Sequence, residues 1–318
     1  MKTQSVIAIQ YFQCSSMGTR FDFLTYGVDE ELFNTLQQRI KQELERIESK
    51  LSRFSPQSEI SRINYLAPDE EVITDEETFS LIMLCKDYYL KTNALFDITL
   101  GRKTEIPSNG SQIRNNAGIP NSTIPFDYSL FGADKISTNT LTTSLRFTNP
   151  FLSIDLGGIG KGYALEKIKQ LCHQFQISNI FISFGESSIT TLGKHPHGNY
   201  WPIGIQHAFS PGPAIYTCKL TDNSMSTSGN SLNNKIKFGE RGHIINPKTG
   251  EFENAAKTIS IVCHSAIEAE VLSTALFIAN EAERAEILDR FSIDEAIQVN
   301  YDDTNNHTII NYNTKVNL

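Results

Sequence analysis

Cysteine is scarce in this sequence, with only five in 318 residues. The five are scattered along the chain and none belongs to a Cys-x-x-Cys pair: they are Cys14, Cys85, Cys172, Cys218 and Cys263. This spacing favours neither a zinc site nor a disulfide framework. We therefore expect free thiols that are buried in the core.

Net positive charge is also lacking. The chain has 28 Lys and Arg residues against 36 Asp and Glu residues, which gives a formal net charge of −8. A surface of this sign repels phosphate backbones, so nonspecific binding to nucleic acid is disfavoured. A small positive site for one nucleotide is still compatible with this charge.

Long hydrophobic runs are absent as well. No segment reaches the roughly 18 apolar residues that a membrane span needs. The apolar stretch near the N-terminus is interrupted by Gln10 and is too short and too polar for a typical signal peptide, and the residues before Cys14 are a poor lipoprotein cleavage context. We expect a cytoplasmic chain, although a chain whose export signal had been removed would look the same.

The hydrophobic pattern predicts both helices and strands. Apolar residues at spacings of three and four predict a helix over 30–51. Capping signatures predict further helices that begin near Thr74, Ser265 and Asn280. Short strands are expected at 151–155, 179–184, 202–206, 257–263, 296–300 and 308–311. Because these helices and strands do not alternate strictly, we predict an α+β fold, with a long surface loop at 103–124.

A glycine-rich loop follows the predicted strand at 151–155 and precedes a predicted helix at about 161–175. Its glycines stand at 157, 158, 160 and 162 and let backbone amides approach a ligand without hindrance from a Cβ atom. The start of the helix favours an anion, and Lys161 is placed to reach a phosphate. The pattern is neither a Walker A motif nor G-x-G-x-x-G. It therefore fits a phosphate cradle and a plain tight turn equally well.

Glu270 and Thr274 lie four residues apart on a predicted helix, so their side chains share one face. A carboxylate and a hydroxyl are oxygen ligands of the kind that magnesium prefers. An acidic residue beside a threonine is also common on ordinary helices. The pair is a candidate metal site and no more than that on its own.

His243 precedes a short apolar pair and a predicted turn in R-G-H-I-I-N-P-K-T-G. A histidine there suits a general base, because its pKa lies near neutrality. A single histidine is more often structural, so both roles stay open.

The segment S-T-S-G-N at 226–230 reads as a turn rich in Ser and Thr. Its hydroxyls and amides suit a phosphate or a ribose. They suit a solvated loop equally well.

Seven segments, taken in order, resemble the ApbE family of FAD:protein FMN transferases. They are M-G-T-R-F at 17–21, L-S-R-F-S-P-Q-S-E-I-S-R-I-N at 51–64, F-D-I-T-L-G at 96–101, D-L-G-G-I-G-K-G-Y-A at 155–164, S-T-S-G-N at 226–230, H-I-I-N-P-K-T-G at 243–250 and S-A-I-E-A-E-V-L-S-T-A-L-F at 265–277. The resemblance implies one α+β domain at 17–318, after an N-terminal segment at 1–16. That domain would have mixed sheets and packed helices around one nucleotide-binding cleft.

The resemblance also implies a reaction. A Thr or Ser hydroxyl of an acceptor flavoprotein from an electron-transfer system would take FMN from FAD in the presence of Mg²⁺, and AMP would leave. The implied magnesium ligands are Glu270, Thr274 and the carbonyl of Gly160, and His243 would activate the acceptor hydroxyl. The implied contacts with the nucleotide are Met17, Gly157, Gly158, Lys161, Phe184, Glu186, Thr227, Ser228 and His243.

This chain departs from the family pattern at four places. Glu270 and Phe184-Gly185-Glu186 stand where the family usually has Asp and Gly-Gly-Asp, and Asn230 and Asn246 each replace an Asp. Magnesium tolerates little distortion of its ligands, and the Phe184 ring could stack on a flavin or adenine or fill the space that the cofactor needs. Two other functions therefore stay open: an FAD-binding protein without transfer, and a magnesium-dependent FAD pyrophosphatase.

Overall fold

The structure is a computed structural model that describes residues 8–101, 128–230, 244–302, 304 and 306–312. The loop expected at 103–124 and the candidate base His243 lie outside the described residues. The chain forms two compact units. Unit 1 comprises 1–48, 157–244 and 253–318, and unit 2 comprises 49–156 and 245–252.

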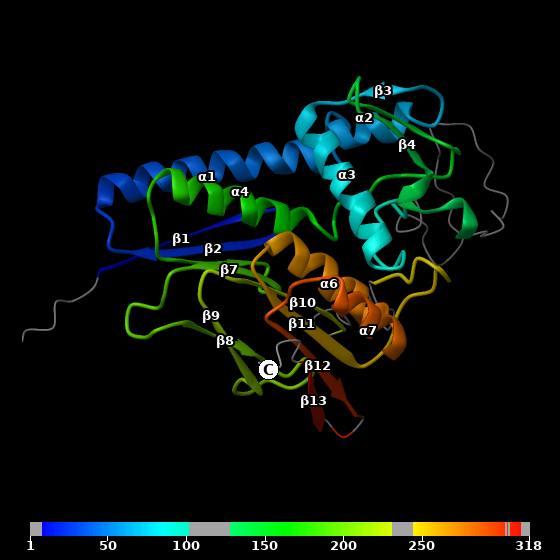
Figure 1. The fold of residues 1–318 in the computed structure, drawn as a ribbon. Coiled ribbons are helices and arrows are strands. Elements are labelled where there is room, and N and C mark those ends of the chain that lie inside the picture. The colour runs from blue at the N-terminus through cyan, green and yellow to red at the C-terminus, as the bar shows by residue number, and fades with distance from the viewer. Residues whose placement is uncertain (1–7, 102–127, 231–243, 303, 305, 313–318) are drawn as a thin grey trace, which may run out of the picture. The chain divides into compact units, whose positions relative to one another are not determined.

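Unit 1 is built on an eight-stranded sheet in the order β1-β2-β6-β7-β10-β11-β12-β13, with each neighbouring pair antiparallel (Figure 1). The strands are β1 (Ile9–Ser16), β2 (Thr19–Tyr26), β6 (Ile180–Phe184), β7 (Ser188–Leu192), β10 (Ser224–Gly229), β11 (Lys257–Cys263), β12 (Glu295–Tyr301) and β13 (His307–Asn311). Four of them match strands expected at 179–184, 257–263, 296–300 and 308–311 to within one residue at each end. Strand β1 lies before residue 17, the start that the resemblance implied for the domain.

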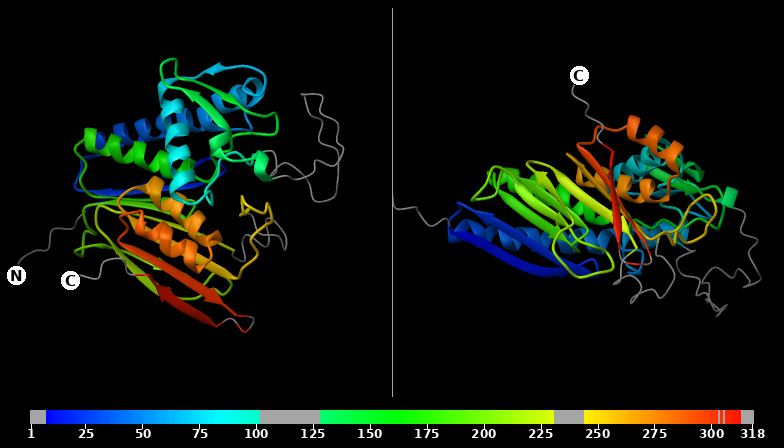
Figure 2. Two further views of the ribbon diagram at one scale, coloured as in Figure 1. Left: turned by 45° about the vertical axis from the view of Figure 1, so that its right-hand side comes forward. Right: turned by 90° about the horizontal axis from the view of Figure 1, so that it is seen from below.

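Helices cover one face of this sheet (Figure 1, Figure 2). They are α1 (Glu30–Leu51, of which residues up to 48 belong to unit 1), α4 (Gly160–Gln174), α6 (Ala266–Ile278) and α7 (Glu281–Asp289). The apolar stripe predicted for 30–51 is confirmed, because Leu36, Ile40, Leu44 and Ile47 are almost completely buried. The predicted caps Ser265 and Asn280 are confirmed as the N-caps of α6 and α7.

A hairpin of β8 (Trp201–Ile205) and β9 (Tyr216–Leu220) covers the other face of the large sheet. Trp201, Ile203 and Leu220 pack there with Met225 of β10 and Val262 of β11 in one hydrophobic cluster. Strand residues alternate between faces, so the neighbour of Met225, Ser226, points toward α6. The large sheet of unit 1 is therefore buried on both faces around β10 and β11.

The described residues of unit 2 form a three-stranded sheet, in the order β3-β5-β4, together with two α-helices and two short 3-10 helices. The α-helices and strands are α2 (Glu59–Leu66), β3 (Val72–Ile73), α3 (Glu76–Lys91), β4 (Ile136–Asn139) and β5 (Ser144–Phe147). The helix expected to begin near Thr74 is confirmed as α3, but its N-cap is Asp75, which accepts from the amide of Thr78 at 2.8 Å, and not Thr74. The strand expected at 151–155 is only a single bridge from Ser153 to Leu100.

The α+β class is confirmed by this arrangement of helices and sheets. All five cysteines are free, and all but Cys14 are buried. Burial raises the pKa of the Cys172 and Cys263 thiols to about 12, which suppresses the reactive thiolate. Within the part of the chain that the structure describes, no helix has the length and apolarity to cross a membrane.

Candidate active site

The Glu270 carboxylate lies at the centre of the candidate site and is held by three hydrogen-bond donors. Its side chain is only 3% exposed. Oε1 accepts from Lys161 Nζ at 2.5 Å and from Ser188 Oγ at 2.6 Å. Oε2 accepts from the amide of Gly162 at 2.7 Å. A buried carboxylate needs such partners, because desolvation of an unpaired charge is costly.

Close packing of α4 against α6 brings these groups together. A Cβ atom on Gly162 would lie 2.6 Å from the carbonyl oxygen of Ala266, so only glycine allows this approach. Helix α6 is apolar on almost every side, as expected for a helix buried between a sheet and another helix. Glu270 is therefore fixed on a rigid element and points at the first turn of α4.

A cluster of hydroxyls extends from Glu270 along the interface between α6 and β10. Ser273 Oγ lies 3.1 Å from Ser226 Oγ and 2.9 Å from Ser228 Oγ. Ser228 Oγ also lies 3.2 Å from Thr274 Oγ1, and Ser273 Oγ donates to the carbonyl of Glu270 at 3.1 Å. Each hydroxyl has a partner, which explains how polar side chains persist in an otherwise apolar interface.

The turn expected at 226–230 is wrong, because residues 224–229 form strand β10. Strand alternation separates the two predicted nucleotide contacts in this segment. Ser228 faces α6, whereas Thr227 Oγ1 lies 2.8 Å from Ser260 Oγ on the opposite face of the sheet. The Ser228 side chain therefore lies beside Thr274, whereas the Thr227 side chain lies on the opposite face of the sheet.

The backbone before α4 is accessible. Gly157 and Gly158 are exposed in the turn that precedes the helix. Met17 lies beside this helix start, since a Cβ atom on Gly160 would meet its Sδ at 3.9 Å. Met17 and Gly18 both have positive φ and form the two-residue turn between β1 and β2, and the amide of Met17 donates to Glu48. Met17, Gly157, Gly158 and Lys161 thus gather at the first turn of α4.

Phe184 occupies the core of unit 1 and is 0% exposed. Its ring packs edge-on against Phe21 at a centroid distance of 5.3 Å. The ring therefore fills core space, and stacking on a cofactor would require it to leave this packing. Glu186 follows in a tight turn with φ of +63°, and its exposed carboxylate lies 3.3 Å from Arg20.

The two asparagines that replace an Asp have structural roles. Asn230 Nδ2 donates to the carbonyls of Glu253 and Ala255, both at 3.0 Å, which a carboxylate cannot do. Asn246 Oδ1 accepts from the amide of Lys248 at 3.0 Å and so closes the turn at 246–250. The acceptor role of Asn246 is one that an Asp could also perform.

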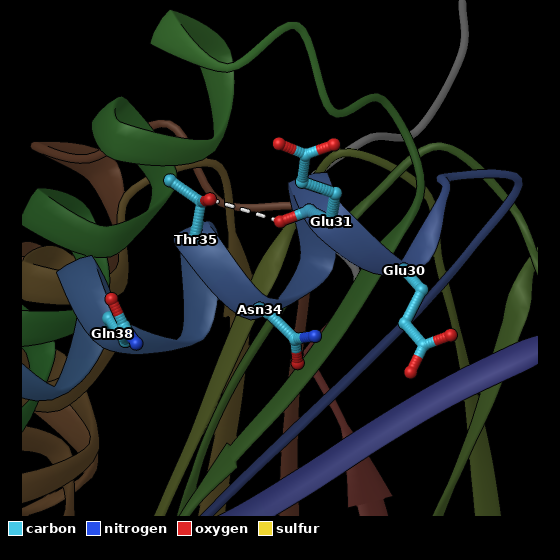
Figure 3. Close-up of a pocket in the computed structure, with 5 residues that line it drawn as sticks. All are labelled: Glu30, Glu31, Asn34, Thr35 and Gln38. Atoms are coloured by element: carbon cyan, nitrogen blue, oxygen red, sulfur yellow. Dashed lines mark hydrogen bonds between the residues drawn. The ribbon is translucent and has the colours of Figure 1, made fainter.

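Two features of the described residues limit where a ligand can bind. No group of three or more His, Cys, Asp or Glu side chains is placed to hold a metal within these residues, so a metal site at Glu270 would depend on hydroxyl and carbonyl oxygens. A surface hollow lies on the first turns of α1 and is lined by Glu30, Glu31, Asn34, Thr35 and Gln38 (Figure 3). It shares no residue with the candidate site and carries negative charge, which is unsuited to an anionic nucleotide.

Two residues of the site were not anticipated. Ser273 lies three residues after Glu270 on one helix, and this spacing alone would have placed it near the same face. Ser188 has no such signal, because its contact with Glu270 joins segments 82 residues apart.

Comparison with known proteins places the chain in a family. The model described as the ApbE family matches residues 17–297. This span is most of the sequence, and the chain belongs to the ApbE family.

Curated relatives carry the name FAD:protein FMN transferase. The one from Chlamydia muridarum is 28% identical over 249 residues, which cover 76% of this chain and 74% of that protein. The one from Salmonella typhimurium is 26% identical over 298 residues, which cover 89% of this chain and 82% of that protein.

Solved structures share the fold. The flavin transferase ApbE from Vibrio cholerae superposes with a TM-score of 0.78 at 20% identity, covering 96% of this chain and 97% of that one. The ApbE protein from Thermotoga maritima gives a TM-score of 0.76 at 23% identity, covering 95% and 96%.

Proposed function

We propose that this chain transfers FMN from FAD to a Thr or Ser hydroxyl of an acceptor flavoprotein in an electron-transfer system, with Mg²⁺ as cofactor and AMP as the leaving group. One structural observation carries the proposal: a buried glutamate, Glu270, is fixed against the glycine-flanked first turn of α4 by Lys161 and the Gly162 amide. The helix N-terminus and the lysine favour the anionic pyrophosphate, and the carboxylate would hold the divalent cation that offsets its charge. The names of the curated relatives support the same activity.

The residues present fit a hard cation. Among the described residues, Oε2 of the Glu270 carboxylate accepts one hydrogen bond, from the Gly162 amide, so an acceptor position remains for a ligand. Thr274, one turn further along α6, and the carbonyl of Gly160 would complete an all-oxygen set of the kind that Mg²⁺ prefers. Bound there, Mg²⁺ would offset negative charge on the phosphates.

The first turn of α4 would hold the phosphates of FAD. The exposed backbone of Gly157 and Gly158 and the dipole of the helix favour an anion. Lys161, on the same turn, adds a positive charge. Met17 borders this turn beside Gly160 and would contact the bound nucleotide.

The transfer itself needs a base and an acceptor. His243 would take the proton from the acceptor hydroxyl, while the oxygen of that hydroxyl forms a bond to the FMN phosphorus. The phosphorus–oxygen bond to AMP breaks, and AMP leaves with the electron pair of that bond. The product is an FMN phosphoester on the acceptor.

Release of AMP from FAD tests this proposal. The purified chain is incubated with FAD and Mg²⁺, with and without an acceptor flavoprotein from an electron-transfer system. Release of AMP that depends on the acceptor, with FMN fluorescence on the denatured acceptor, is the expected result. AMP and free FMN without an acceptor would mean a pyrophosphatase, and bound FAD without AMP would mean a flavin-binding protein.

A further inference from the structure

A lysine of the same chain, Lys161, neutralises the charge of Glu270 in this structure. Lys161 Nζ lies 2.5 Å from Oε1 of a carboxylate that is 3% exposed, whereas the Lys161 side chain is 24% exposed. One end of this ion pair is thus fixed in the interior, and the other end reaches solvent. A lysine in that position can withdraw along its flexible stem without unfolding anything around it.

Glu270 has two hydrogen-bond donors besides Lys161. Ser188 Oγ and the Gly162 amide each hold one carboxylate oxygen, and both donors are neutral. They therefore position the carboxylate for any cation that approaches it, without repelling that cation. Of the three donors, only the Lys161 ammonium conflicts with a second positive charge at this carboxylate, because like charges repel strongly where water is excluded.

We propose that Lys161 is a resident counter-ion that exchanges with a divalent cation at Glu270. In the metal-free chain the ammonium neutralises the carboxylate. When the cation binds, Lys161 leaves Glu270 and its charge becomes available at the first turn of α4 for a phosphate of the substrate. Metal binding thereby precedes and promotes nucleotide binding. The inference rests on the proposed function for the location of the metal.

Replacement of Lys161 by a neutral side chain of similar length tests the exchange. Binding of Mn²⁺ is measured by electron paramagnetic resonance, with no FAD and no acceptor present. We expect K161M to bind Mn²⁺ at least tenfold more tightly than the unmodified chain. Unchanged or weaker binding by K161M would overturn the proposal. So would a failure of both the unmodified chain and K161M to bind Mn²⁺.

Lys169 offers a matched control on the same helix. Lys169 is buried, and its Nζ donates to the carbonyl of His264 at 3.1 Å and lies 4.0 Å from Glu166. K169M removes a buried lysine without touching Glu270, so its affinity for Mn²⁺ should equal that of the unmodified chain. An equal gain in both variants would overturn the proposal, because the effect would then be a general loss of positive charge.

A measurement on the unmodified chain covers the case in which K161M fails to fold. Reductive methylation followed by mass spectrometry reports the reactivity of each lysine. Mg²⁺ should raise the rate at Lys161 severalfold and leave Lys169 unchanged. A rate at Lys161 that Mg²⁺ leaves unchanged or lowers would overturn the exchange. These results are independent of transfer, so exchange without AMP release would reject the proposed function and keep this inference.

Discussion

Gly162 packs directly on the backbone of Ala266, and a Cβ atom at position 162 would lie 2.6 Å from the Ala266 carbonyl oxygen. This is closer than real Cβ contacts allow, so α4 and α6 meet only because residue 162 is glycine. The same glycine donates its amide to Glu270. Packing of the two helices and orientation of the buried carboxylate therefore depend on one residue.

Substitution of Gly162 by alanine should destabilise unit 1. In an ordinary helix this change is stabilising by up to about 1 kcal/mol, but here the clash with Ala266 should reverse the sign and cost roughly 2 kcal/mol. G160A is the matched control in the same turn, since its Cβ would meet only Met17 Sδ, at 3.9 Å. Urea unfolding measures both, and a G162A chain as stable as G160A would contradict the packing argument.

Asn230→Asp should destabilise the chain although it restores the residue usual in the family. Asn230 is buried and donates to two carbonyls, and a carboxylate there would face both without a proton to donate. We expect a loss of about 2–3 kcal/mol, typical of a buried polar group left without its partner. Asn139→Asp is the control, because Asn139 is exposed and its Oδ1 accepts from Leu141. Equal stability of the two variants in urea unfolding would refute the donor role of Asn230.

The free energy of unfolding should fall as pH rises from about 4 to about 6, because Asp97 keeps its proton over this range in the folded state but not in the unfolded chain. Desolvation raises the pKa of this carboxyl to about 6, against the hydrogen bonds from Thr99 that lower it. The folded state then holds a proton that the unfolded chain has released, so folding is favoured below this range and loses that contribution above it. We expect a change of about 2 kcal/mol. D97N should flatten this part of the pH profile, and profiles of equal slope would show that another group is responsible.

Glu270→Ala should abolish the magnesium dependence of AMP release. The substitution removes the only carboxylate of the proposed metal site and leaves the Lys161 ammonium without its partner. We expect loss of activity by at least a hundredfold, measured over a range of Mg²⁺ concentrations. E286A is the comparison, because Glu286 lies on α7 outside the proposed site, with its side chain 61% exposed and 3.7 Å from Arg290. A Glu270→Ala chain with the Mg²⁺ response of the unmodified chain would remove Glu270 from the ligand set.

His243→Ala should abolish transfer and spare FAD binding. General bases commonly contribute factors of about 10²–10⁴ to a rate, and the loss should fall in this range. Binding is followed by flavin fluorescence and transfer by FMN on the acceptor. Flavinylation at the normal rate would refute the assignment of His243 as the base.

Sequence patterns predicted the elements whose signals are local. The stripe of α1 and the caps Ser265 and Asn280 depend on residues a few positions apart, so periodicity and capping chemistry were sufficient. Asp75 was missed as the N-cap because Thr74 gives the same capping signal one residue earlier. In the structure it is the Asp75 side chain that accepts from a backbone amide of the first turn, that of Thr78.

Elements and contacts that depend on distant partners were not predictable in this way. The hydroxyls of β10 look like a polar turn, and only the approach of Ser273 from α6 makes them acceptable in a buried strand. The sequence left two roles open for the Phe184 ring, stacking on the cofactor or filling space, because it does not reveal that Phe21 lies beside this ring. The motifs identified the family and the Glu270 helix, but the contact of Ser188 with that glutamate required the fold.

The pairing of Phe21 with Phe184 has a consequence for biosynthesis. Strands β1 and β2 emerge from the ribosome early, yet their partner β6 is made only after the whole 49–156 portion of unit 2. Until then the nascent hairpin carries an open edge on β2 and a bare apolar face, both of which invite aggregation. Early packing of α1 against this hairpin would cover the apolar face before β6 is made.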